Sequence, residues 1–285
     1  MVRKAVITAA GQGTRFLPVT RAIPKEMIPL VSKPLVHYAV AEAVAAGIGE
    51  IIFVMAPGRH AIEDYFGRNL KLERFLEKKG ETKLLEEMRA ISDMAEFRYV
   101  RQKEPRGLGH AVLTARELVG DEPFAVILPD DIIDAGVPAL KQMLAVHREC
   151  GLSVIAVEKI KPRDSVKYGV ISPEAISPRT YRVMGLVEKP PPAEAPSNLG
   201  VVGRYILTPE VFEEISATPP GKIKEIQLTD ALQRLLGRQA IYALRFEGTR
   251  YDTGTPLGML EASVALALKN PALSKELRAY LKTLI

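Results

Sequence analysis

The chain has 285 residues, of which 47% are hydrophobic and 26% charged, so it holds enough apolar material for a sizeable buried core and is not a disordered polypeptide. Its net charge of +5 is mild, and its lysines and arginines are spread among acidic residues, which suits a phosphorylated substrate better than nucleic acid. Tryptophan is absent and only 6% of the residues are aromatic, so we expect no nucleic-acid partner.

The sequence also disfavours a disulfide, structural zinc and a membrane span. Cys150 is the only cysteine, which excludes an intrachain disulfide, and one cysteine with four scattered histidines gives no zinc motif. No apolar run approaches the roughly 18 residues that cross a bilayer. The apolar N-terminal stretch leads into a glycine loop, unlike a signal peptide with its small-residue cleavage site. We therefore expect a cytoplasmic protein without a membrane partner.

Short apolar runs alternate with helical patterns through the first half of the chain. The predicted strands cover residues 4–8, 51–55, 97–100, 124–128 and 153–158. This alternation predicts an α/β, Rossmann-like fold with a mainly parallel mixed sheet and helices on both faces. A packing helix is predicted at residues 34–46, with Gly47 suited to end it, and residues 62–94 predict a charged helical insertion that covers the surface.

The second half has shorter strands that are broken by proline. These are predicted at residues 168–172, 181–188 and 200–207, with a rigid loop at 190–196. No flexible linker separates the halves, so we expect one domain over residues 1–285, built from residues 1–157, a β-rich part at 158–256 and helices at 257–285. The helical tail is interrupted at Pro271 and is typical of a pair that packs on its own domain or contacts another subunit.

A glycine loop follows the first predicted strand. It contains Ala10, Gly11, Gly13 and Thr14, whose backbone N–H groups can point at an anion beyond the strand end. A dinucleotide fingerprint would need a third glycine where Phe16 stands, and the loop also lacks the Gly-Lys-Ser/Thr of a Walker motif. The loop alone fits a phosphate site and a ligand-free tight turn equally well.

The segment after this loop carries two cations on a stiff backbone. Arg15, Lys25 and Glu26 lie within residues 13–30, where three prolines prevent a regular helix, and the cations suit a triphosphate clamp. This segment resembles the signature of the sugar-1-phosphate nucleotidyltransferase family, and its Pro-Lys-Glu-Met run is similar to the branch that contains the bacterial UTP–glucose-1-phosphate uridylyltransferases. Relatives that use dTTP usually carry Ser-Lys-Gln at this point.

The resemblance extends from residue 4 to about residue 259 and implies a nucleotide site. It assigns Ala10, Gly11, Gly13, Thr14 and Glu26 to nucleotide binding. Residues 101–111 are similar to the family segment in which Gln102 reads the uracil edge and Gly107 lets the base lie against the backbone. Without that context, Gln102 is better explained as a solvated strand end. His110 could be considered as a covalent nucleophile, but its position after Gly-Leu-Gly favours the start of a helix.

The resemblance also implies a magnesium site. Asp130 and Asp131 end an apolar strand, where the ligands of α/β proteins usually bind, and Asp130 aligns with the family's metal-binding aspartate. Asp252 lies in a segment similar to the second metal segment, although an aspartate before Thr-Gly is by itself an ordinary turn residue. We predict that Asp130 and Asp252 hold Mg²⁺, with Asp131 as the less favoured alternative ligand.

The sugar phosphate is assigned to the second half by resemblance alone. Family segments at residues 168–171, 187–190 and 198–205 imply that it contacts Asp131, Gly169, Glu188, Lys189 and Gly203. Lys189 would hold the nucleophilic phosphate, and its alternative is a solvated surface charge. Residues 225–231 also match the family and are interpreted as a helix start beside the sugar site, with a purely architectural role as the alternative. The departures from the family pattern are at Arg106, Gly200, Pro256 and Met259, and Pro256 removes a phosphate contact that a lysine there would supply.

Together these features predict an enzyme that transfers a uridylyl group from UTP to glucose 1-phosphate, with Mg²⁺ as cofactor. The sugar phosphate would attack the α-phosphorus directly, with Arg15, Lys25, Asp130, Lys189 and Asp252 as the catalytic set. The same chemistry on dTTP and a non-catalytic sugar-nucleotide sensor are the alternatives. The apolar residues of the tail predict a homo-oligomer, a dimer or tetramer.

Overall fold

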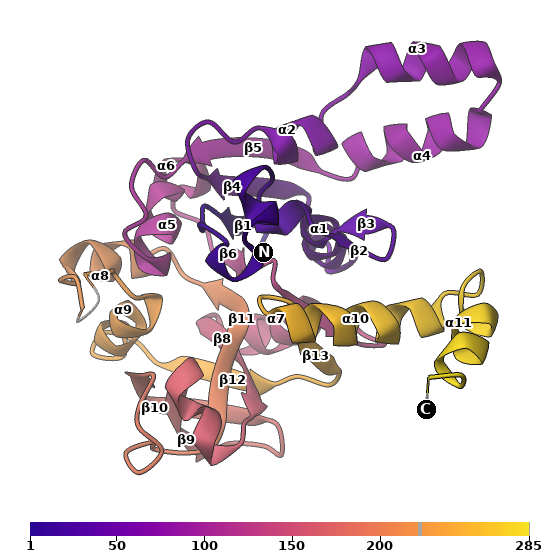
Figure 1. Cartoon of the computed structure of the whole chain (residues 1–285). Coiled ribbons are helices and arrows are strands. Elements are labelled where there is room, and N and C mark those ends of the chain that lie inside the picture. Colours follow the sequence, from indigo (N-terminus) through magenta and orange to yellow (C-terminus); the bar gives the residue numbers. More distant parts are fainter. Residues whose placement is uncertain (222–223, 285) are drawn as a thin grey trace.

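A nine-stranded mixed sheet forms the centre of the computed structural model, which describes residues 1–221 and 224–284 (Figure 1). The strand order is β5-β4-β1-β6-β11-β8-β12-β10-β9. The strands are β1 (Lys4–Ala9), β4 (Glu50–Met55), β5 (Glu96–Arg101), β6 (Phe124–Ile127), β8 (Ser153–Lys159), β9 (Gly169–Ala175), β10 (Thr180–Glu188), β11 (Leu199–Leu207) and β12 (Ile241–Arg245). The predicted α/β class and mixed sheet are confirmed, but the sheet is not mainly parallel, because β11 pairs antiparallel with β6, β8 and β9 and β10 pairs antiparallel with β12 and β9.

Helices cover the sheet and extend beyond it. They are α1 (Leu35–Ala45), α2 (Ala61–Phe66), α3 (Leu70–Lys79), α4 (Thr82–Ser92), α5 (Leu108–Thr114), α6 (Arg116–Val119), α7 (Ala139–Cys150), α8 (Val211–Ala217), α9 (Leu228–Leu235), α10 (Pro256–Lys269) and α11 (Ser274–Leu281). None of the helices in the described part of the chain is long and apolar enough to cross a membrane.

The strands β5, β4, β1 and β6 are parallel, and β4, β1 and β6 are buried on both faces, whereas β5 is the partly exposed edge strand. Successive residues of β1 alternate between two cores: Ile7 packs with α1 on one face, and Val6 packs with α5 on the other. The helix α1 ends as the sequence predicts, because Gly47 follows its last turn with φ of 91°, a value that favours glycine.

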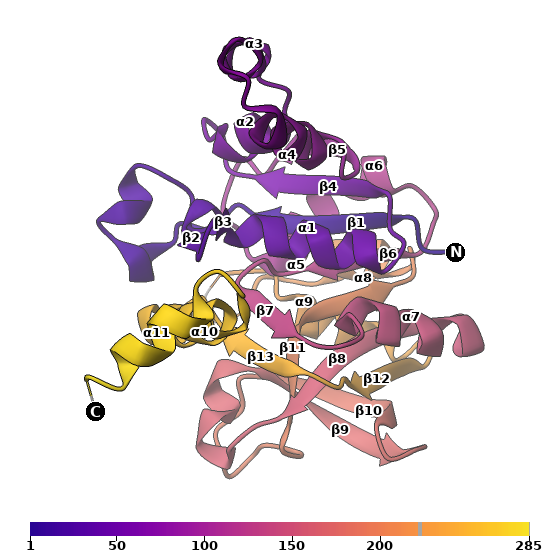
Figure 2. The same cartoon turned by 90° about the vertical axis from the view of Figure 1, so that its right-hand side faces the viewer.

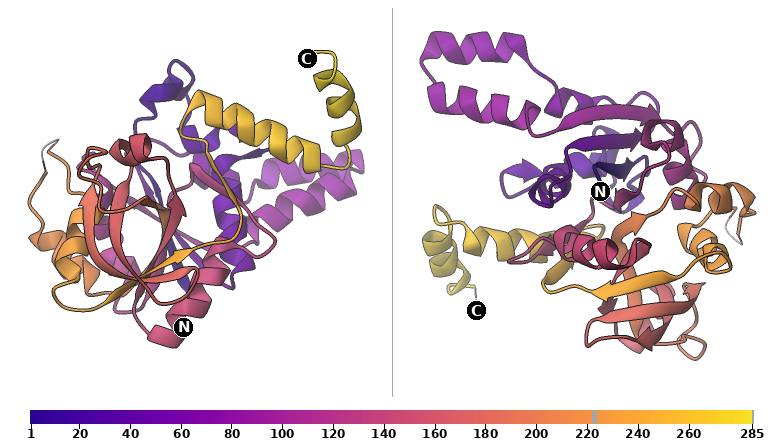
Figure 3. Two further views of the ribbon diagram at one scale, coloured as in Figure 1. Left: turned by 90° about the horizontal axis from the view of Figure 1, so that it is seen from below. Right: turned by 180° about the vertical axis from the view of Figure 1, so that it is seen from behind.

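Residues 62–94 form the three helices α2, α3 and α4, and the α3-α4 pair projects from the body (Figures 1 and 3). Glu73 ties the pair together because it bonds Arg68 on one side and Arg89 on the other. The insertion lies at the surface, as expected, but most of the hairpin extends past the sheet instead of covering it.

The second half of the sheet curls back on itself. Besides its long pairings with β6 and β8, β11 pairs with β9 through Gly200 and Val170, so β11, β8, β12, β10 and β9 close into a ring (Figure 3). The strand β12 was not predicted from the sequence. It completes the ring by pairing in parallel with β8 and antiparallel with β10.

Two short ribbons accompany the main sheet. One pairs β2 (Pro29–Leu30) with β3 (Lys33–Pro34), and the other pairs β7 (Asp131–Asp134) with β13 (Thr249–Asp252). The register of the second ribbon sets Asp252 opposite Asp131. The tail then continues as α10 and α11, which extend away from the sheet (Figure 2). The predicted tail of residues 257–285 is helical as expected, and residue 285 lies outside the described residues.

Candidate active site

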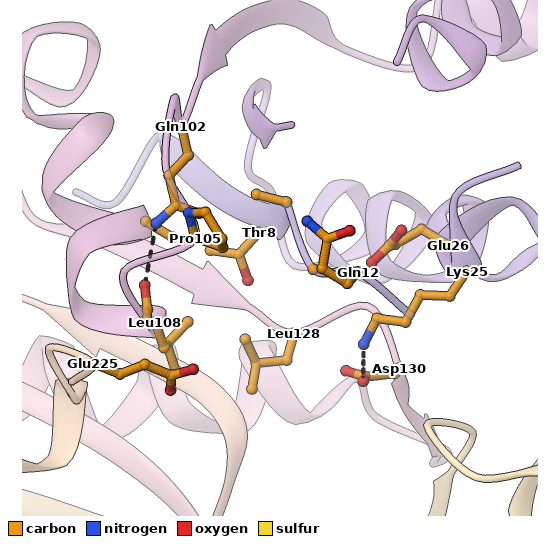
Figure 4. Close-up of a pocket in the computed structure, with 14 residues that line it drawn as sticks. Thr8, Gln12, Lys25, Glu26, Gln102, Pro105, Leu108, Leu128, Asp130 and Glu225 are labelled. Carbon is orange, nitrogen blue, oxygen red and sulfur yellow. Dashed lines mark hydrogen bonds and ion pairs between the residues drawn. The ribbon is translucent and has the colours of Figure 1, made fainter. Parts of the chain in front are cut away.

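Two cavities open at the carboxyl end of the parallel strands. The strands β1 and β6 are parallel neighbours, so the glycine loop after β1 and Asp130 after β6 come to the same edge of the sheet. The first cavity has a volume of about 410 Å³ and the second about 530 Å³. Both are lined by Leu108, Leu128 and Asp130, which therefore stand where the cavities meet (Figure 4).

The first cavity gathers most of the residues predicted to bind a nucleotide. Its lining includes Ala10, Gly11, Lys25, Glu26, Gln102, Gly107 and Asp130. Gly13 and Thr14 instead line a neighbouring hollow together with Arg15 and Lys25. Gly13 has φ of 65°, and a β-carbon there would approach the Thr20 side chain to 2.9 Å, so both the turn and the packing require glycine.

Lys25 and Asp130 form an ion pair at the junction of the two cavities. Burial lowers the pKa of Lys25, but the neighbouring carboxylates, Asp130 foremost, together outweigh burial and the pKa rises. Burial likewise raises the pKa of Asp130, and the Lys25 ammonium reverses this so that the pKa falls below its ordinary value. The junction therefore holds a fixed positive and a fixed negative charge before any substrate binds.

Glu26 is a buried carboxyl group beside this pair. Only 1% of the residue is exposed, and neither carboxyl oxygen has a hydrogen-bond partner among the described residues. Burial raises the pKa of Glu26 to about 7. Glu26 thus belongs to the wall of the first cavity, with both carboxyl oxygens buried behind its surface.

Glu26 should make the stability of the free protein depend on pH. Its pKa rises on folding from 4.5 to about 7. Its contribution to the free energy of unfolding is therefore complete below pH 4.5 and is lost as the pH rises through 7. The loss is on the order of 3 kcal/mol. We expect Glu26→Gln, which cannot ionise, to raise the melting temperature near pH 8 and leave it little changed near pH 5. Melting curves that fall in parallel for both proteins over this range would contradict the expectation.

Asp130 and Asp252 face one small space. The point that a β-carbon on Gly254 would occupy lies 3.0 Å from Asp130 Oδ2 and 3.0 Å from Asp252 Oδ1, so only a glycine leaves this space open. Thr253 fixes the arrangement because its N–H and its hydroxyl both donate to the Asp130 carbonyl, at 2.8 and 2.7 Å. Arg15 Nη1 lies 3.6 Å from the same point, and Asp252 Oδ1 accepts from Gly254 N at 3.1 Å. Two carboxylates that face each other across so short a gap suit a hard divalent cation.

Both carboxylate oxygens of Asp131 accept hydrogen bonds from other residues of the protein. Its Oδ2 accepts from Gly203 N at 2.8 Å, and its Oδ1 accepts from Arg250 Nε at 2.5 Å. Burial raises the pKa of Asp131, and the Arg250 guanidinium opposes that rise. Among the described residues, no three His, Cys, Asp or Glu side chains cluster as a ready-made metal site. Two carboxylates alone do not fill the coordination shell of a hard cation, which water and phosphate oxygens can complete.

The second cavity gathers the residues predicted to bind the sugar phosphate. Its lining includes Arg15, Asp131, Gly169, Glu188, Lys189, Gly203 and Asp252. Lys189 adopts φ of 48° and its Nζ lies 3.1 Å from Glu188 Oε1. A β-carbon on Gly169 would approach Thr229 Oγ1 to 2.9 Å, so this glycine is required by packing against the α9 start as well as by the cavity.

Several residues of the second cavity were missed by the sequence analysis. Arg250 bonds Glu158 at 2.6 Å and the Tyr168 hydroxyl at 3.1 Å, with its guanidinium over the Tyr168 ring. Gln227 and Thr229 also line the cavity; their segment was expected beside the sugar site, but neither residue was named as a contact. The resemblance at residues 225–231 was the signal that could have suggested a binding role.

A buried arginine supports the loop that carries Asp130. Arg204 is 1% exposed and forms an ion pair with Glu42 at 2.8 Å. Its remaining N–H groups donate to the carbonyls of Leu128, Gly203 and Asp131. Arg204 thereby holds the chain on both sides of Asp130, which fixes that carboxylate from behind.

The comparisons with known proteins agree with this geometry. The model of the nucleotidyl transferase family matches residues 4–269. A UTP–glucose-1-phosphate uridylyltransferase of Staphylococcus epidermidis is 48% identical over 283 residues, which are 99% of this chain and 98% of that relative.

Solved structures give the same result. A UDP-glucose pyrophosphorylase complexed with UDP-glucose superposes with a TM-score of 0.87 at 45% identity, covering 95% of this chain and 100% of the other. A UTP-bound UGPase from Acinetobacter baumannii superposes with a TM-score of 0.93 at 39% identity, covering 100% of both chains.

Proposed function

This chain belongs to the nucleotidyl transferase family, and we propose that it transfers the uridylyl group of UTP to glucose 1-phosphate, giving UDP-glucose and pyrophosphate. The observation that carries the proposal is the junction of two cavities at Asp130, where one polyanion can lie in each cavity with its reacting group at the boundary. The parallel half of the sheet, with ligands at its carboxyl edge, supports the Rossmann-like description of the nucleotide-binding part.

The residues of the first cavity and its neighbouring hollow would bind UTP. Lys25 stands at the boundary, and Arg15 lines both the adjoining hollow and the second cavity, so both cations would contact the triphosphate and the departing pyrophosphate where the two substrates meet. Gln102 and Gly107 lie at the far end of the cavity, where the base would be placed (Figure 4). The nucleotide would thus run from the loop at residue 102 toward Asp130.

Glucose 1-phosphate would occupy the second cavity. Lys189 would bind its phosphate and Glu188 would accept hydrogen bonds from sugar hydroxyls. The attacking phosphate oxygen is already an anion, so transfer needs no general base, and the protein accelerates it by holding both substrates in line and by offsetting their negative charge.

We assign Mg²⁺ to the space between Asp130 and Asp252. The carboxylate oxygens around this space and its small size suit Mg²⁺. The charge of the ion would screen the two substrate phosphates from each other. We further propose that the enzyme works in the cytoplasm, in keeping with its single cysteine.

Pyrophosphate release over a grid of nucleotides and sugar 1-phosphates tests the proposed function. We expect the highest kcat/KM with UTP and glucose 1-phosphate and no release when the sugar phosphate is omitted. A better rate with ATP or GTP than with UTP would overturn the assignment of the base site. Binding of both substrates without any release would instead favour a sensor.

We also propose that the protein is a homo-oligomer. Leu257, Leu260 and Val264 are exposed on α10, and none of the described residues of α11 is buried. This apolar surface on a projecting tail suits a contact with a second copy. Light scattering at micromolar concentration should give a dimer or tetramer, and Leu257→Lys together with Leu260→Lys should shift it toward the monomer. A monomeric mass for the parent protein would contradict the proposal.

A further inference from the structure

Gln102, at the base end of the nucleotide cavity, is 5% exposed and its amide has a single allowed orientation. Its backbone N–H donates to the Met55 carbonyl at 2.9 Å, which anchors the residue at the end of β5. Its Nε2 lies 3.3 Å from the Gly107 carbonyl, the contact drawn as a dashed line in Figure 4. A carbonyl oxygen only accepts hydrogen bonds, so the amide nitrogen must face Gly107 and the amide oxygen must face away.

The Gly107 carbonyl is itself held in place. It accepts the Ala111 N–H at 3.1 Å, the first bond of α5. A β-carbon on Gly107 would approach the Ile226 carbonyl to 2.7 Å, and Ile226 N in turn donates to the Arg106 carbonyl at 2.8 Å. The loop is thus packed between α5 and the segment before α9, and the Gly107 carbonyl cannot turn without breaking its bond from Ala111.

His110 receives the second amide hydrogen of Gln102. Its Nδ1 lies 2.9 Å from Gln102 Nε2, and since that nitrogen donates, Nδ1 must be the unprotonated, accepting nitrogen of a neutral imidazole. Both hydrogens of the amide are therefore used within the protein. None of the described residues donates to Gln102 Oε1, which is left to accept a hydrogen bond from a ligand in the cavity.

We propose that His110 is a positioning residue for base selection, holding Gln102 so that only its amide oxygen is offered to the base. This inference rests on the proposed function, in which the base lies beside Gln102. Uracil and thymine present an N3–H donor to an acceptor, whereas the N3 of cytosine is itself an acceptor and would face oxygen lone pairs. His110 would thereby make the site reject cytidine nucleotides without separating uracil from thymine.

Two near-isosteric substitutions of His110 test this role. In His110→Asn, the side-chain oxygen occupies the position of Nδ1 and can accept from Gln102, whereas His110→Leu has no acceptor. The quantities to measure are kcat and KM for UTP, CTP and dTTP at saturating glucose 1-phosphate. The parent protein should prefer UTP over CTP, and His110→Leu should reduce that preference at least about tenfold, through the KM for UTP and with little change in kcat. His110→Asn should keep the preference within a few-fold of the parent.

The dTTP measurement and a double mutant make the test specific. The ratio of UTP to dTTP should stay constant in every variant, since both bases carry the same N3–H. Gln102→Leu should lose the preference by itself, and adding His110→Leu to it should cost no further discrimination, because the two residues act as one unit. Melting curves check folding, and His110→Ala replaces His110→Leu if the latter does not fold.

The outcomes separate this inference from the proposed function. An unchanged preference for UTP over CTP in His110→Leu, or an equal loss in His110→Asn and His110→Leu, would overturn the role of His110 while uridylyl transfer by the parent protein stands. Absence of UTP turnover in the parent protein would overturn the proposed function and the inference together.

Discussion

Replacing Asp252 by asparagine should lower kcat by about two to three orders of magnitude, because it removes one of the two carboxylates that face the space beside Gly254. The substitution keeps the size of the side chain and removes its charge. Asp130→Asn should cost at least as much, since it also leaves the Lys25 ammonium without its partner. Both variants should need more Mg²⁺ for half-maximal rate, which a metal titration of pyrophosphate release measures.

The losses of kcat in Asp130→Asn and Asp252→Asn should not be additive in free energy. If both carboxylates hold one ion, the double variant should fall well short of the product of the single effects. Calorimetric titration with Mn²⁺ in the presence of UTP measures metal binding independently of turnover. Each single variant should bind Mn²⁺ more weakly than the parent protein. Near-parent activity in Asp252→Asn would reject the shared ion.

The structure also selects the control for this series. Asp131→Asn is unsuitable, because Asp131 is buried against Arg250 and its replacement would cost about 3–5 kcal/mol of stability. Asp134 lies on the same strand and pairs with Lys269 at the surface. Asp134→Asn should leave kcat and the magnesium requirement unchanged. A loss of activity as large as that of Asp252→Asn would show that the effect is not specific to the pair.

Replacing Lys189 by alanine should raise the KM for glucose 1-phosphate about ten- to a hundredfold while the KM for UTP changes little. Lys189 lines the second cavity and is absent from the lining of the first, so its charge should act on the sugar phosphate alone. Initial rates with each substrate varied in turn give both constants.

Lys159→Ala is the matched control, because Lys159 is exposed at the end of β8 and lines neither cavity. It should leave both KM values unchanged. An unaltered KM for glucose 1-phosphate in Lys189→Ala would contradict this role and would favour the alternative, a solvated charge beside Glu188.

The sheet could be predicted from the sequence where its strands are continuous apolar runs. β1, β4 and β6 are buried on both faces, so each appears as an unbroken hydrophobic segment between polar loops. β12 has only five residues, and although residues 241–244 are all hydrophobic, so short an apolar run does not by itself distinguish a strand from a helix. Its identity as a strand depends on neighbours that are far away in the sequence, β8 and β10.

The site residues could be named from resemblance, but their connections could not. The proximity of Asp252 to Asp130 depends on the register of the β7-β13 ribbon, which joins segments more than a hundred residues apart. The ion pair between Arg204 and Glu42 and the lack of partners for Glu26 are likewise tertiary features. The orientation of the Gln102 amide can be assigned only when the position of the Gly107 carbonyl is known.

The stereochemical course at the α-phosphorus tests most directly the claim that glucose 1-phosphate attacks UTP itself. The measurement uses the protein with one diastereomer of UTP that carries sulfur on the α-phosphate, glucose 1-phosphate and Mg²⁺, followed by assignment of the product's configuration by phosphorus NMR. One in-line displacement between the two cavities predicts a UDP-glucose analogue with inverted configuration. Retained configuration would require an intermediate on the enzyme and would contradict direct transfer.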